Sequence, residues 1–444
     1  MRKLLVANRG EIAARVIRSA ASMGIATVAV YSEADADLPF ASAADEAVLI
    51  GPPPPAQSYL DVTAVLAAAA TTGADAVHPG YGFLSESPDF ASAVVAAGLT
   101  WVGPDPSAMA AMSDKIDARN RMAAAGVPVA PGTAEPVADE ADAVRAAAAI
   151  GYPVMVKAAA GGGGIGMAVA SDEGELRGAF ETARTRAERF FANPSIMLEK
   201  YIASARHIEV QILGYPDGTV VALGERECSV QRRHQKVAEE SPSVAVDDTL
   251  RTRLVEIAVA AGVAVGYRNA GTVELLLDSD TDEVYFLEMN TRLQVEHPVT
   301  EMVTGVDLVA EQLRIAAGEP ASFGDEAPPS RGHALEFRVY AEDPKRFLPG
   351  PGTITTWREP DAAHVRVDAG YRAGNVVTPF YDPLMAKLVV WGEDRPSALA
   401  RAEQAVADFE IVGPKCNLAF FTELLANPDF RSGDYDTGLV ASMR

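Results

Sequence analysis

The sequence contains little cysteine and no long apolar segment. Cys228 and Cys416 are the only cysteines among 444 residues, which is too few for a disulfide framework or a cysteine-based metal site. Such low usage is typical of a reducing compartment, so we expect a cytoplasmic protein. No run of 18 apolar residues occurs, and no membrane span is expected. The apolar stretch Leu4–Ala7 is shorter than the core of a signal peptide.

Basic residues are also scarce. The chain has 38 Lys+Arg against 61 Asp+Glu, a formal net charge of -23. Because non-specific nucleic-acid binding requires a basic face, we expect no nucleic-acid partner, and an anionic nucleotide must be held by local cations. Hydrophobic residues at 48% indicate a globular protein. At roughly 150 residues per domain, the length predicts two or three domains.

The N-terminal region alternates short apolar strands with amphipathic helices. A strand at Leu4–Ala7 precedes a helix near Glu11–Met23, and a second strand follows at Thr27–Tyr31. This alternation continues through His78 and Trp101, which predicts a parallel sheet covered by helices.

A second region begins near Ser113 with a helix, and it contains a small lobe from Pro128 to about Glu199. Further on, we expect strands at Thr272–Leu277 and Val284–Glu288 and one helix from about Glu301 to Ala317. The proline-containing segment 321–332 is typical of a linker. The predicted domains are 1–112, 113–320 with a lid at 128–203, and 330–440.

A glycine-rich loop, residues 161–166, follows an apolar strand that ends in Lys157. Without Cβ atoms, its backbone N–H groups can close on an anion, as a mobile lid over phosphates does. The loop is neither the Rossmann fingerprint, which opens a helix, nor a P-loop, which continues into Gly-Lys-Ser/Thr. A glycine run is about as often a flexible turn, so this motif alone is weak.

Polar and charged residues are concentrated after the strand that delivers Glu288. Alternation sends Glu288, Asn290 and Arg292 to one side, and Gln294 and Glu296 follow. Mg²⁺ prefers carboxylate and amide oxygens, and it needs few protein ligands when it is shared with a triphosphate. Glu274 supplies a second carboxylate if the two strands pair. A single glutamate here is better interpreted as a solvated edge-strand charge, but the whole cluster favours a functional site.

A third cluster, residues 225–236, is rich in arginine, histidine and lysine within a very acidic chain. It is a plausible anion site, although a basic run is as often an exposed face paired with neighbouring acids. Cys228 within it is more typical of a small packing residue than of a nucleophile.

These clusters, in this order and spacing, resemble the biotin carboxylase family of the ATP-grasp superfamily. The resemblance covers nearly the whole chain and is carried by Ala7–Ala13, His78–Glu86, the glycine loop, Arg226–Lys236, Glu288–Glu301 and Arg338. It implies an α/β and α+β multidomain fold. The expected parts are a Rossmann-like N-terminal domain, an ATP-grasp central domain with a mobile lid, and a C-terminal biotin carboxylase lobe.

The resemblance also implies a role for each matching residue. The implied phosphate ligands are Lys115, Lys157 and the amides of Gly163 and Gly164. The implied adenine and nucleotide contacts are Met167, Glu199, Lys200, Ile202, Leu276, His207, Gln231 and His234. The implied metal ligands are Glu274, Glu288 and Asn290, of which the two glutamates also contact ATP. The implied bicarbonate pocket is Lys236, Arg292, Gln294, Val295 and Glu296. The implied biotin site is Arg338 with Tyr81 and Gly82.

The implied cofactors are ATP and Mg²⁺ or Mn²⁺, and the substrate is carrier-bound biotin. Glu296 is the expected general base on bicarbonate, with Lys236 and Arg292 offsetting charge as carboxyphosphate forms. Arg338 is expected to stabilise the biotin oxyanion. The expected partners are a second copy in a homodimer, a biotin carboxyl carrier protein and a carboxyltransferase subunit. The acceptor finally carboxylated stays open, with an acyl-CoA carboxylase as our expectation.

Two departures from the family pattern stand out. Ala160 replaces a frequent glycine and Ile165 a frequent basic residue, so lid mobility and phosphate affinity can differ. No Ala-Met-Lys-Met biotinylation motif is present, and Pro383–Lys387 lies within the expected C-terminal lobe. We therefore expect biotin to arrive on a separate carrier.

Two other hypotheses are an ATP-grasp ligase that joins a carboxylate to an amine and a catalytically silent regulatory subunit. The amine ligase is disfavoured by Arg338 and the Gln294–Glu296 segment. Replacing Arg292 with alanine separates the silent subunit from the enzyme. If charge stabilisation at Arg292 is central, Arg292→Ala lowers the rate of biotin carboxylation by several orders of magnitude. A silent subunit has no carboxylation to lose, whereas an amine requirement in a substrate screen supports the other ligase.

Overall fold

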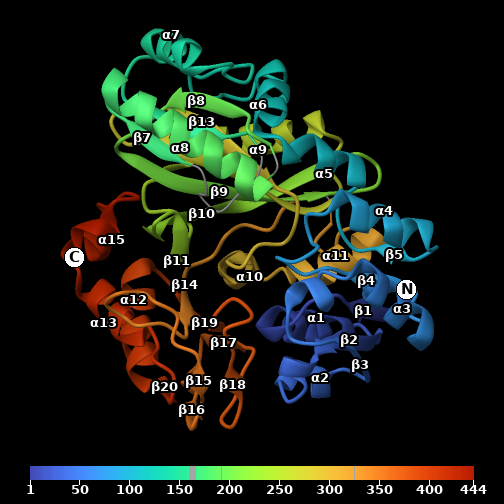
Figure 1. The fold of residues 1–444 in the computed structure, drawn as a ribbon. Coiled ribbons are helices and arrows are strands. Elements are labelled where there is room, and N and C mark those ends of the chain that lie inside the picture. The colour runs from blue at the N-terminus through green and yellow to red at the C-terminus, as the bar shows by residue number, and fades with distance from the viewer. Residues whose placement is uncertain (160–166, 192, 325) are drawn as a thin grey trace.

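The structure is a computed structural model that describes residues 1–159, 167–191, 193–324 and 326–444. The chain forms three regions in order: the N-terminal region in blue, the lid with the central body in green to yellow, and the C-terminal lobe in orange to red (Figure 1). Gly163 and Gly164, two of the predicted phosphate ligands, lie outside the described residues. Within the described residues, no helix combines enough length and hydropathy to span a bilayer.

The N-terminal region is built on a five-stranded parallel sheet in the order β3-β2-β1-β4-β5. Its strands are β1 (Lys3–Val6), β2 (Ala26–Ser32), β3 (Glu46–Gly51), β4 (Ala76–His78) and β5 (Thr100–Trp101). The helices of this part of the chain are α1 (Gly10–Ser22), α2 (Pro39–Ala43), α3 (Val62–Thr72), α4 (Pro88–Ala96), α5 (Pro106–Ser113) and α6 (Lys115–Ala124). The predicted alternation of strand and helix is confirmed.

The side chains of β1 alternate between two apolar cores. Leu4 and Val6 point to the face that α1 covers, and Leu5 points to the opposite face with the core residues of α3 and α4. The buried face of α1 carries Ile12 and Val16, as its period predicts. That core continues into residues of the C-terminal lobe, so α1 is packed between two domains.

A large eight-stranded sheet forms the central body and continues into the C-terminal lobe. Its order is β13-β12-β9-β10-β11-β14-β19-β17, with antiparallel neighbours throughout. The strands are β9 (Ala205–Gly214), β10 (Val220–Arg232), β11 (Gln235–Ser241), β12 (Asn269–Asp278), β13 (Val284–Asn290), β14 (His333–Tyr340), β17 (Val365–Ala369) and β19 (Leu384–Gly392). The two domains are joined by the β11–β14 ladder, in which Ala238 pairs with Phe337.

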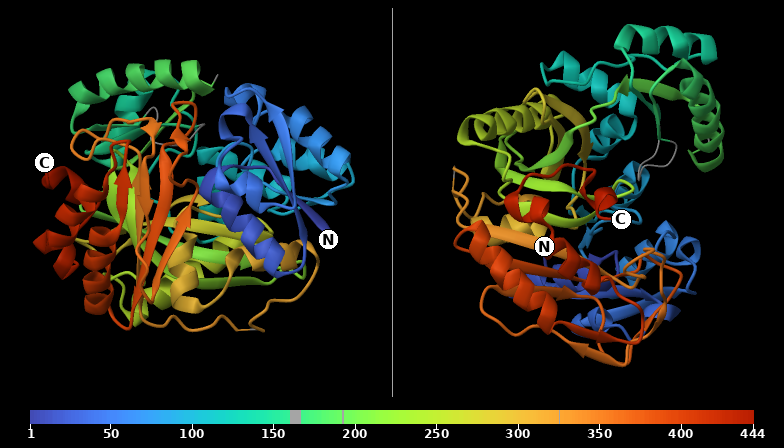
Figure 2. Two further views of the ribbon diagram at one scale, coloured as in Figure 1. Left: turned by 90° about the horizontal axis from the view of Figure 1, so that it is seen from below. Right: turned by 90° about the vertical axis from the view of Figure 1, so that its left-hand side faces the viewer.

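The lid is a separate small unit with its own apolar core. A three-stranded antiparallel sheet, in the order β7-β6-β8, packs against two helices. These elements are α7 (Glu140–Ile150), β6 (Val154–Ala158), β7 (Ala168–Ala170), α8 (Glu173–Phe191) and β8 (Ile196–Lys200). In the right-hand view of Figure 2, the two lid helices lie at the top and upper right edge of the molecule, and the blue N-terminal region lies below them.

The single helix expected over residues 301–317 is wrong, because the structure has two helices there. They are α10 (His297–Thr304) and α11 (Leu308–Ala316), with α9 (Asp248–Ala264) preceding them in the central body. Gly305 ends α10 in a left-handed conformation, with φ at 75°, which glycine adopts without steric cost. Asp307 then caps α11 by accepting a hydrogen bond from the Ala310 N–H. Both signals are visible in the sequence, but the continuous apolar pattern concealed them.

The C-terminal lobe covers its end of the large sheet with helices. Phe337 of β14 and Phe421 have ring centroids 5.1 Å apart in this core. The remaining elements are β15 (Gly352–Thr353), β16 (Thr356–Arg358), β18 (Val376–Val377), α12 (Arg395–Asp408), β20 (Glu410–Val412), α13 (Leu418–Ala426), α14 (Pro428–Ser432) and α15 (Leu439–Ser442).

Gly370, at the end of β17, lies directly against the start of α1. A Cβ atom at this position meets the backbone nitrogen of Glu11 at 2.6 Å. Because backbone cannot move aside cheaply, Gly370→Ala is expected to destabilise the protein by about 1–3 kcal/mol. The measurement is the midpoint of thermal unfolding. Gly350→Ala is the matched control, since its nearest neighbour lies at 3.5 Å; equal midpoints for the two variants contradict the prediction.

Candidate active site

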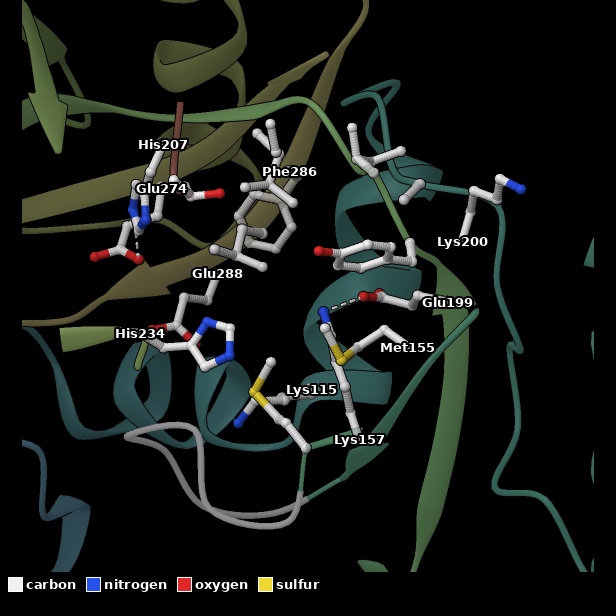
Figure 3. Close-up of a pocket in the computed structure, with 18 of the residues that line it drawn as sticks. Lys115, Met155, Lys157, Glu199, Lys200, His207, His234, Glu274, Phe286 and Glu288 are labelled. Atoms are coloured by element: carbon white, nitrogen blue, oxygen red, sulfur yellow. Dashed lines mark hydrogen bonds and ion pairs between the residues drawn. The ribbon is translucent and has the colours of Figure 1, made fainter. Parts of the chain in front are cut away.

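Two adjoining cavities lie between the lid, the large sheet and the N-terminal region. The first is drawn in Figure 3. It is lined by every described residue that the resemblance assigned to ATP. They are Lys115, Lys157, Met167, Glu199, Lys200, Ile202, His207, Gln231, His234, Glu274, Leu276 and Glu288. The second cavity is lined by all residues assigned to bicarbonate and biotin, and by Asn290. They are Tyr81, Gly82, Lys236, Asn290, Arg292, Gln294, Val295, Glu296 and Arg338.

Glu274 and Glu288 stand opposite each other on paired strands. They are register partners in the antiparallel β12–β13 ladder, so the condition for a second carboxylate is met, and both line both cavities. Burial and the charge of Glu274 raise the pKa of Glu288. Two carboxylates that repel each other in a buried position, with the amide of Asn290 nearby, are a donor set of hard oxygens that fits Mg²⁺.

Lys236 lies at the junction of the two cavities, surrounded by three carboxylates. Its ammonium donates to Glu209 at 2.5 Å, to Glu296 at 2.6 Å and to Glu274 at 2.7 Å. Although burial opposes the charged form, these carboxylates, Glu209 foremost, raise the pKa of Lys236 well above its ordinary value. Lys236 therefore stays protonated and connects the predicted metal carboxylate to the predicted base.

Glu296 is held by two cations. Its second oxygen accepts a hydrogen bond from Arg338 at 2.9 Å, and Arg338 also donates to Glu239 at 2.6 Å. Burial favours the neutral acid, but Lys236 and Arg338 hold the pKa of Glu296 well below its ordinary range. Glu239, in contrast, has its pKa raised to about 7 by burial, against the effect of Arg338. At neutral pH, Glu296 is ionised and able to accept a proton.

Arg292 follows β13 and lines the second cavity. Its guanidinium donates to Asn290 Oδ1 at 2.8 Å, and its Nε lies 3.1 Å from the carboxylate of Glu86. Glu86 lies within a segment that carried the resemblance, but it was not among the predicted site residues. Burial opposes the charged form, but Glu86 raises the pKa of Arg292, which therefore stays charged beside the cavity.

The nucleotide cavity has lysines on one side and His207 and Glu274 on the other (Figure 3). Lys157 is hydrogen-bonded to Glu199. The side chain of Lys200 points away from the cavity and donates to the carbonyls of Gly151 and Tyr152 at 3.0 and 2.9 Å. Lys200 therefore presents its backbone rather than its ammonium to the cavity.

A short chain of polar groups orients His207. The side-chain amide of Gln231 lies 2.8 Å from His207 Nδ1, and His207 Nε2 lies 3.0 Å from Glu274. If the amide nitrogen donates to Nδ1, the ring proton sits on Nε2 and faces the carboxylate. The side chain of His234 is exposed at the tip of the β10–β11 hairpin, where it borders both cavities.

The basic cluster at residues 225–236 is divided between different roles. Arg226, expected in an anion site, is fully buried and lines neither of the two cavities. Its guanidinium bonds Glu209, and donates to Gln294 Oε1 at 2.9 Å and Thr300 at 2.9 Å. Arg226 thereby supports residues that line the site. Its buried position depends on tertiary packing. Residue spacing alone therefore could not show that Arg226 differs in role from the other basic residues of the cluster.

A small lid facing a large antiparallel sheet, with lysines and paired carboxylates around the cleft between them, defines an ATP-grasp ligase. Three family descriptions match the sequence: "Biotin carboxylase, N-terminal domain" over residues 1–109, "Carbamoyl-phosphate synthase L chain, ATP binding domain" over 114–322 and "Biotin carboxylase C-terminal domain" over 336–442. The chain belongs to the biotin carboxylase family and is an ATP-dependent ligase.

Curated relatives match the chain along its length. Biotin carboxylase 2 of Bacillus subtilis is 51% identical over 438 residues, which cover 99% of this chain and 98% of the relative. A pyruvate carboxylase subunit of Methanothermobacter thermautotrophicus is 48% identical over 443 residues, which cover 100% of this chain and 90% of the relative.

Solved structures are equally similar. The biotin carboxylase–β-γ-ATP complex of Campylobacter jejuni has a TM-score of 0.96 and 44% identity, covering 99% of this chain and 98% of that one. The biotin carboxylase domain dimer of the Hydrogenobacter thermophilus 2-oxoglutarate carboxylase, with MgADP, ADP and bicarbonate, has a TM-score of 0.96 and 42% identity, covering 99% and 97%.

The buried guanidinium of Arg226 compensates the charge of Glu209, which is itself buried. Arg226→Met removes this partner and is therefore expected to lower the free energy of unfolding by about 3–5 kcal/mol. The measurement is urea unfolding followed by fluorescence. Arg253→Met, which breaks the exposed ion pair with Glu283, is the matched control and should change stability by less than about 1 kcal/mol. Comparable losses in the two variants show that Arg226 has no special role.

Proposed function

We propose that this chain carboxylates biotin on a separate carrier protein and serves as the biotin carboxylase component of an acyl-CoA carboxylase. One observation carries the assignment of the site: the Lys236 ammonium bridges Glu274 of the nucleotide cavity and Glu296 of the adjoining cavity. A single group thus touches both the predicted metal carboxylate and the predicted base. This arrangement suits a reaction that couples phosphoryl transfer to the activation of a small anion.

In the proposed first half-reaction, Glu296 accepts the proton of bicarbonate. The bicarbonate oxygen attacks the γ-phosphorus of ATP in line, and ADP leaves as carboxyphosphate forms. Lys236 and Arg292 offset the negative charge that develops on the transferred group. A magnesium ion held by Glu274, Glu288 and Asn290 supplies further charge neutralisation on the phosphates.

In the proposed second half-reaction, carboxyphosphate breaks down to CO₂ and phosphate. The phosphate takes the proton from the ureido nitrogen of biotin, which then attacks CO₂. Arg338 stabilises the oxyanion on the biotin ring, with Tyr81 and Gly82 bordering the ring. Closure of the lid must exclude water at this stage, because hydrolysed carboxyphosphate loses the energy of ATP.

The burial of Lys387 bears on where biotin can be attached. The Pro383–Lys387 segment contains a Met-Ala-Lys sequence, but Lys387 is fully buried within β19. A biotinylated lysine must be exposed on a mobile segment to reach both active sites of a carboxylase. Lys387 cannot serve as the biotin attachment site.

The final acceptor is proposed from the relatives, which differ from one another. The rice relative at 49% identity is the alpha subunit of methylcrotonoyl-CoA carboxylase, of which this chain covers 60%. A pyruvate carboxylase assembly is the second candidate, because the Methanothermobacter relative carries that name at similar identity. Purification of the native complex and identification of its biotinylated and transferase partners separates the two candidates.

We also propose a homodimer, because the Hydrogenobacter structure is described as a dimer. Sedimentation at micromolar concentration is expected to give twice the mass of the chain. A monomer under these conditions rejects this part of the proposal.

The proposed role of Glu296 gives a prediction for ATP cleavage. ADP release by the protein is expected to depend on bicarbonate and to increase with free biotin. Glu296→Gln removes the base and should lower the bicarbonate-dependent rate about 10²–10⁴-fold. Glu342→Gln is the control, since Glu342 pairs with Arg232 and lines neither cavity. ADP release that is indifferent to bicarbonate contradicts the proposed function.

A further inference from the structure

Lys387 is a fully buried lysine whose ammonium reaches the bicarbonate pocket from outside the cavity. Its Nζ donates to the main-chain carbonyl of Val295 at 3.0 Å. Val295 lines the second cavity, between the side chains of Gln294 and Glu296. Lys387 itself does not line either cavity. Lys387 therefore contacts the main chain of the loop at residues 294–296, which forms part of the proposed bicarbonate site, from outside the cavity.

Lys387 and Arg338 are neighbours across two strands. They are register partners in the antiparallel β14–β19 ladder, so their side chains leave the same face of the sheet. Arg338 donates to the Glu296 carboxylate at 2.9 Å, while Lys387 donates to the carbonyl of the preceding residue. Two adjacent strands thus hold the main-chain carbonyl of Val295 and the side-chain carboxylate of Glu296.

Acidic residues from three elements lie around the buried Lys387, and Glu11 is its ion-pair partner. The carboxylate of Glu11, in the first turn of α1, lies 3.2 Å from Nζ. Asp368 of β17 is its register partner on the other strand. Glu336 of β14 is fully buried in the same region, and neither of its carboxylate oxygens is hydrogen-bonded to a described residue. A buried ammonium is costly unless it is paired and hydrogen-bonded, and both conditions are met here.

The contact joins all three parts of the molecule. Lys387 belongs to the C-terminal lobe, Glu11 to the N-terminal region and Val295 to the segment after β13 in the central body. The Val295 carbonyl belongs to the peptide unit that links Val295 to Glu296, and Glu296 lines the cavity. A fixed donor on this carbonyl restrains the rotation of that peptide plane.

We propose that Lys387 is a positioning residue for the bicarbonate pocket, which it acts on by fixing the Val295 carbonyl; this inference rests on the proposed function of that pocket. Lys387 touches no reacting atom. Its effect is therefore expected on the binding of bicarbonate rather than on the nucleotide cavity, which lies on the other side of Lys236.

The test compares a charge-balanced variant with wild type by steady-state kinetics. Lys387→Met alone leaves Glu11 buried without its partner and can fail to fold, so the double variant Glu11→Gln/Lys387→Met is the main one to measure. We expect its KM for bicarbonate to rise at least tenfold, while its KM for ATP stays within about twofold of wild type. Equal rises in both KM values, or no rise for bicarbonate, overturn the proposal. Because Glu11 lines the second cavity, Glu11→Gln alone is measured beside the double variant, and an equal rise in the single variant overturns the proposal.

Glu336→Gln is the matched control. It replaces the carboxyl of another buried acid in the same cluster, which makes no hydrogen bond to the loop within the described residues, so the KM for bicarbonate should not change. A rise as large as in the double variant shows that any disturbance of the buried cluster is sufficient, and it overturns the specific role of Lys387.

A crystal structure of the double variant decides the question without activity. A displaced or rotated Val295 carbonyl supports the positioning role, and an unchanged loop overturns it. Bicarbonate-dependent ADP release by the wild-type protein reports separately on the proposed function. Its absence rejects that function, while the position of the loop still tests Lys387.

Discussion

One ammonium group surrounded by three carboxylates lies at the centre of the site. Lys236 is within 2.7 Å of Glu209, Glu274 and Glu296, and its charge lowers the pKa of Glu274 and Glu296 against the effect of burial. Without the cation, these buried carboxylates would lose a partner, which is costly. The nucleotide cavity and the bicarbonate pocket meet at this group, so its position sets the geometry of both.

The continuous eight-stranded sheet is what allows these charges to meet. Because β11 pairs with β14, the strand of Lys236 and Glu239 is held beside the strand of Arg338. A ladder of backbone hydrogen bonds between domains is stiffer than a docked interface of side chains. The lid, in contrast, has its own core and its own sheet, separate from the large one.

Charge in this molecule is concentrated where the fold buries it. The chain carries a formal net charge of -23, yet the residues around Glu296 include Lys236, Arg226 and Arg338. Burial alone would raise the pKa of every carboxylate in the group. The cations lower the pKa of Glu296 and Glu274, while Glu239 and Glu288, with less compensation, remain raised. The same residue type thus takes on different protonation states through its neighbours.

The residue pattern of the sequence and its family resemblance predicted much of the fold and of the candidate site. The strand–helix alternation predicted the N-terminal parallel sheet. Two neighbouring strands were also predicted, and the structure pairs them with Glu274 opposite Glu288. The described residues assigned to ATP, metal, bicarbonate and biotin all border the two cavities; their individual roles stay predictions. Local signals are sufficient here because β-strands alternate their side chains regularly and because a dense polar motif after a buried strand is rarely accidental.

The tertiary structure alone decided the contacts between residues distant in the chain. Arg226 is a buried support rather than an anion ligand, Lys200 turns away from the cavity, and Lys387 reaches the Val295 carbonyl across 92 positions of sequence. Every residue has a main-chain carbonyl, so a sequence motif cannot predict which carbonyl a side chain will contact. Whether a charged side chain faces water or another charge depends on which strands become neighbours, and that is fixed only when the domains pack.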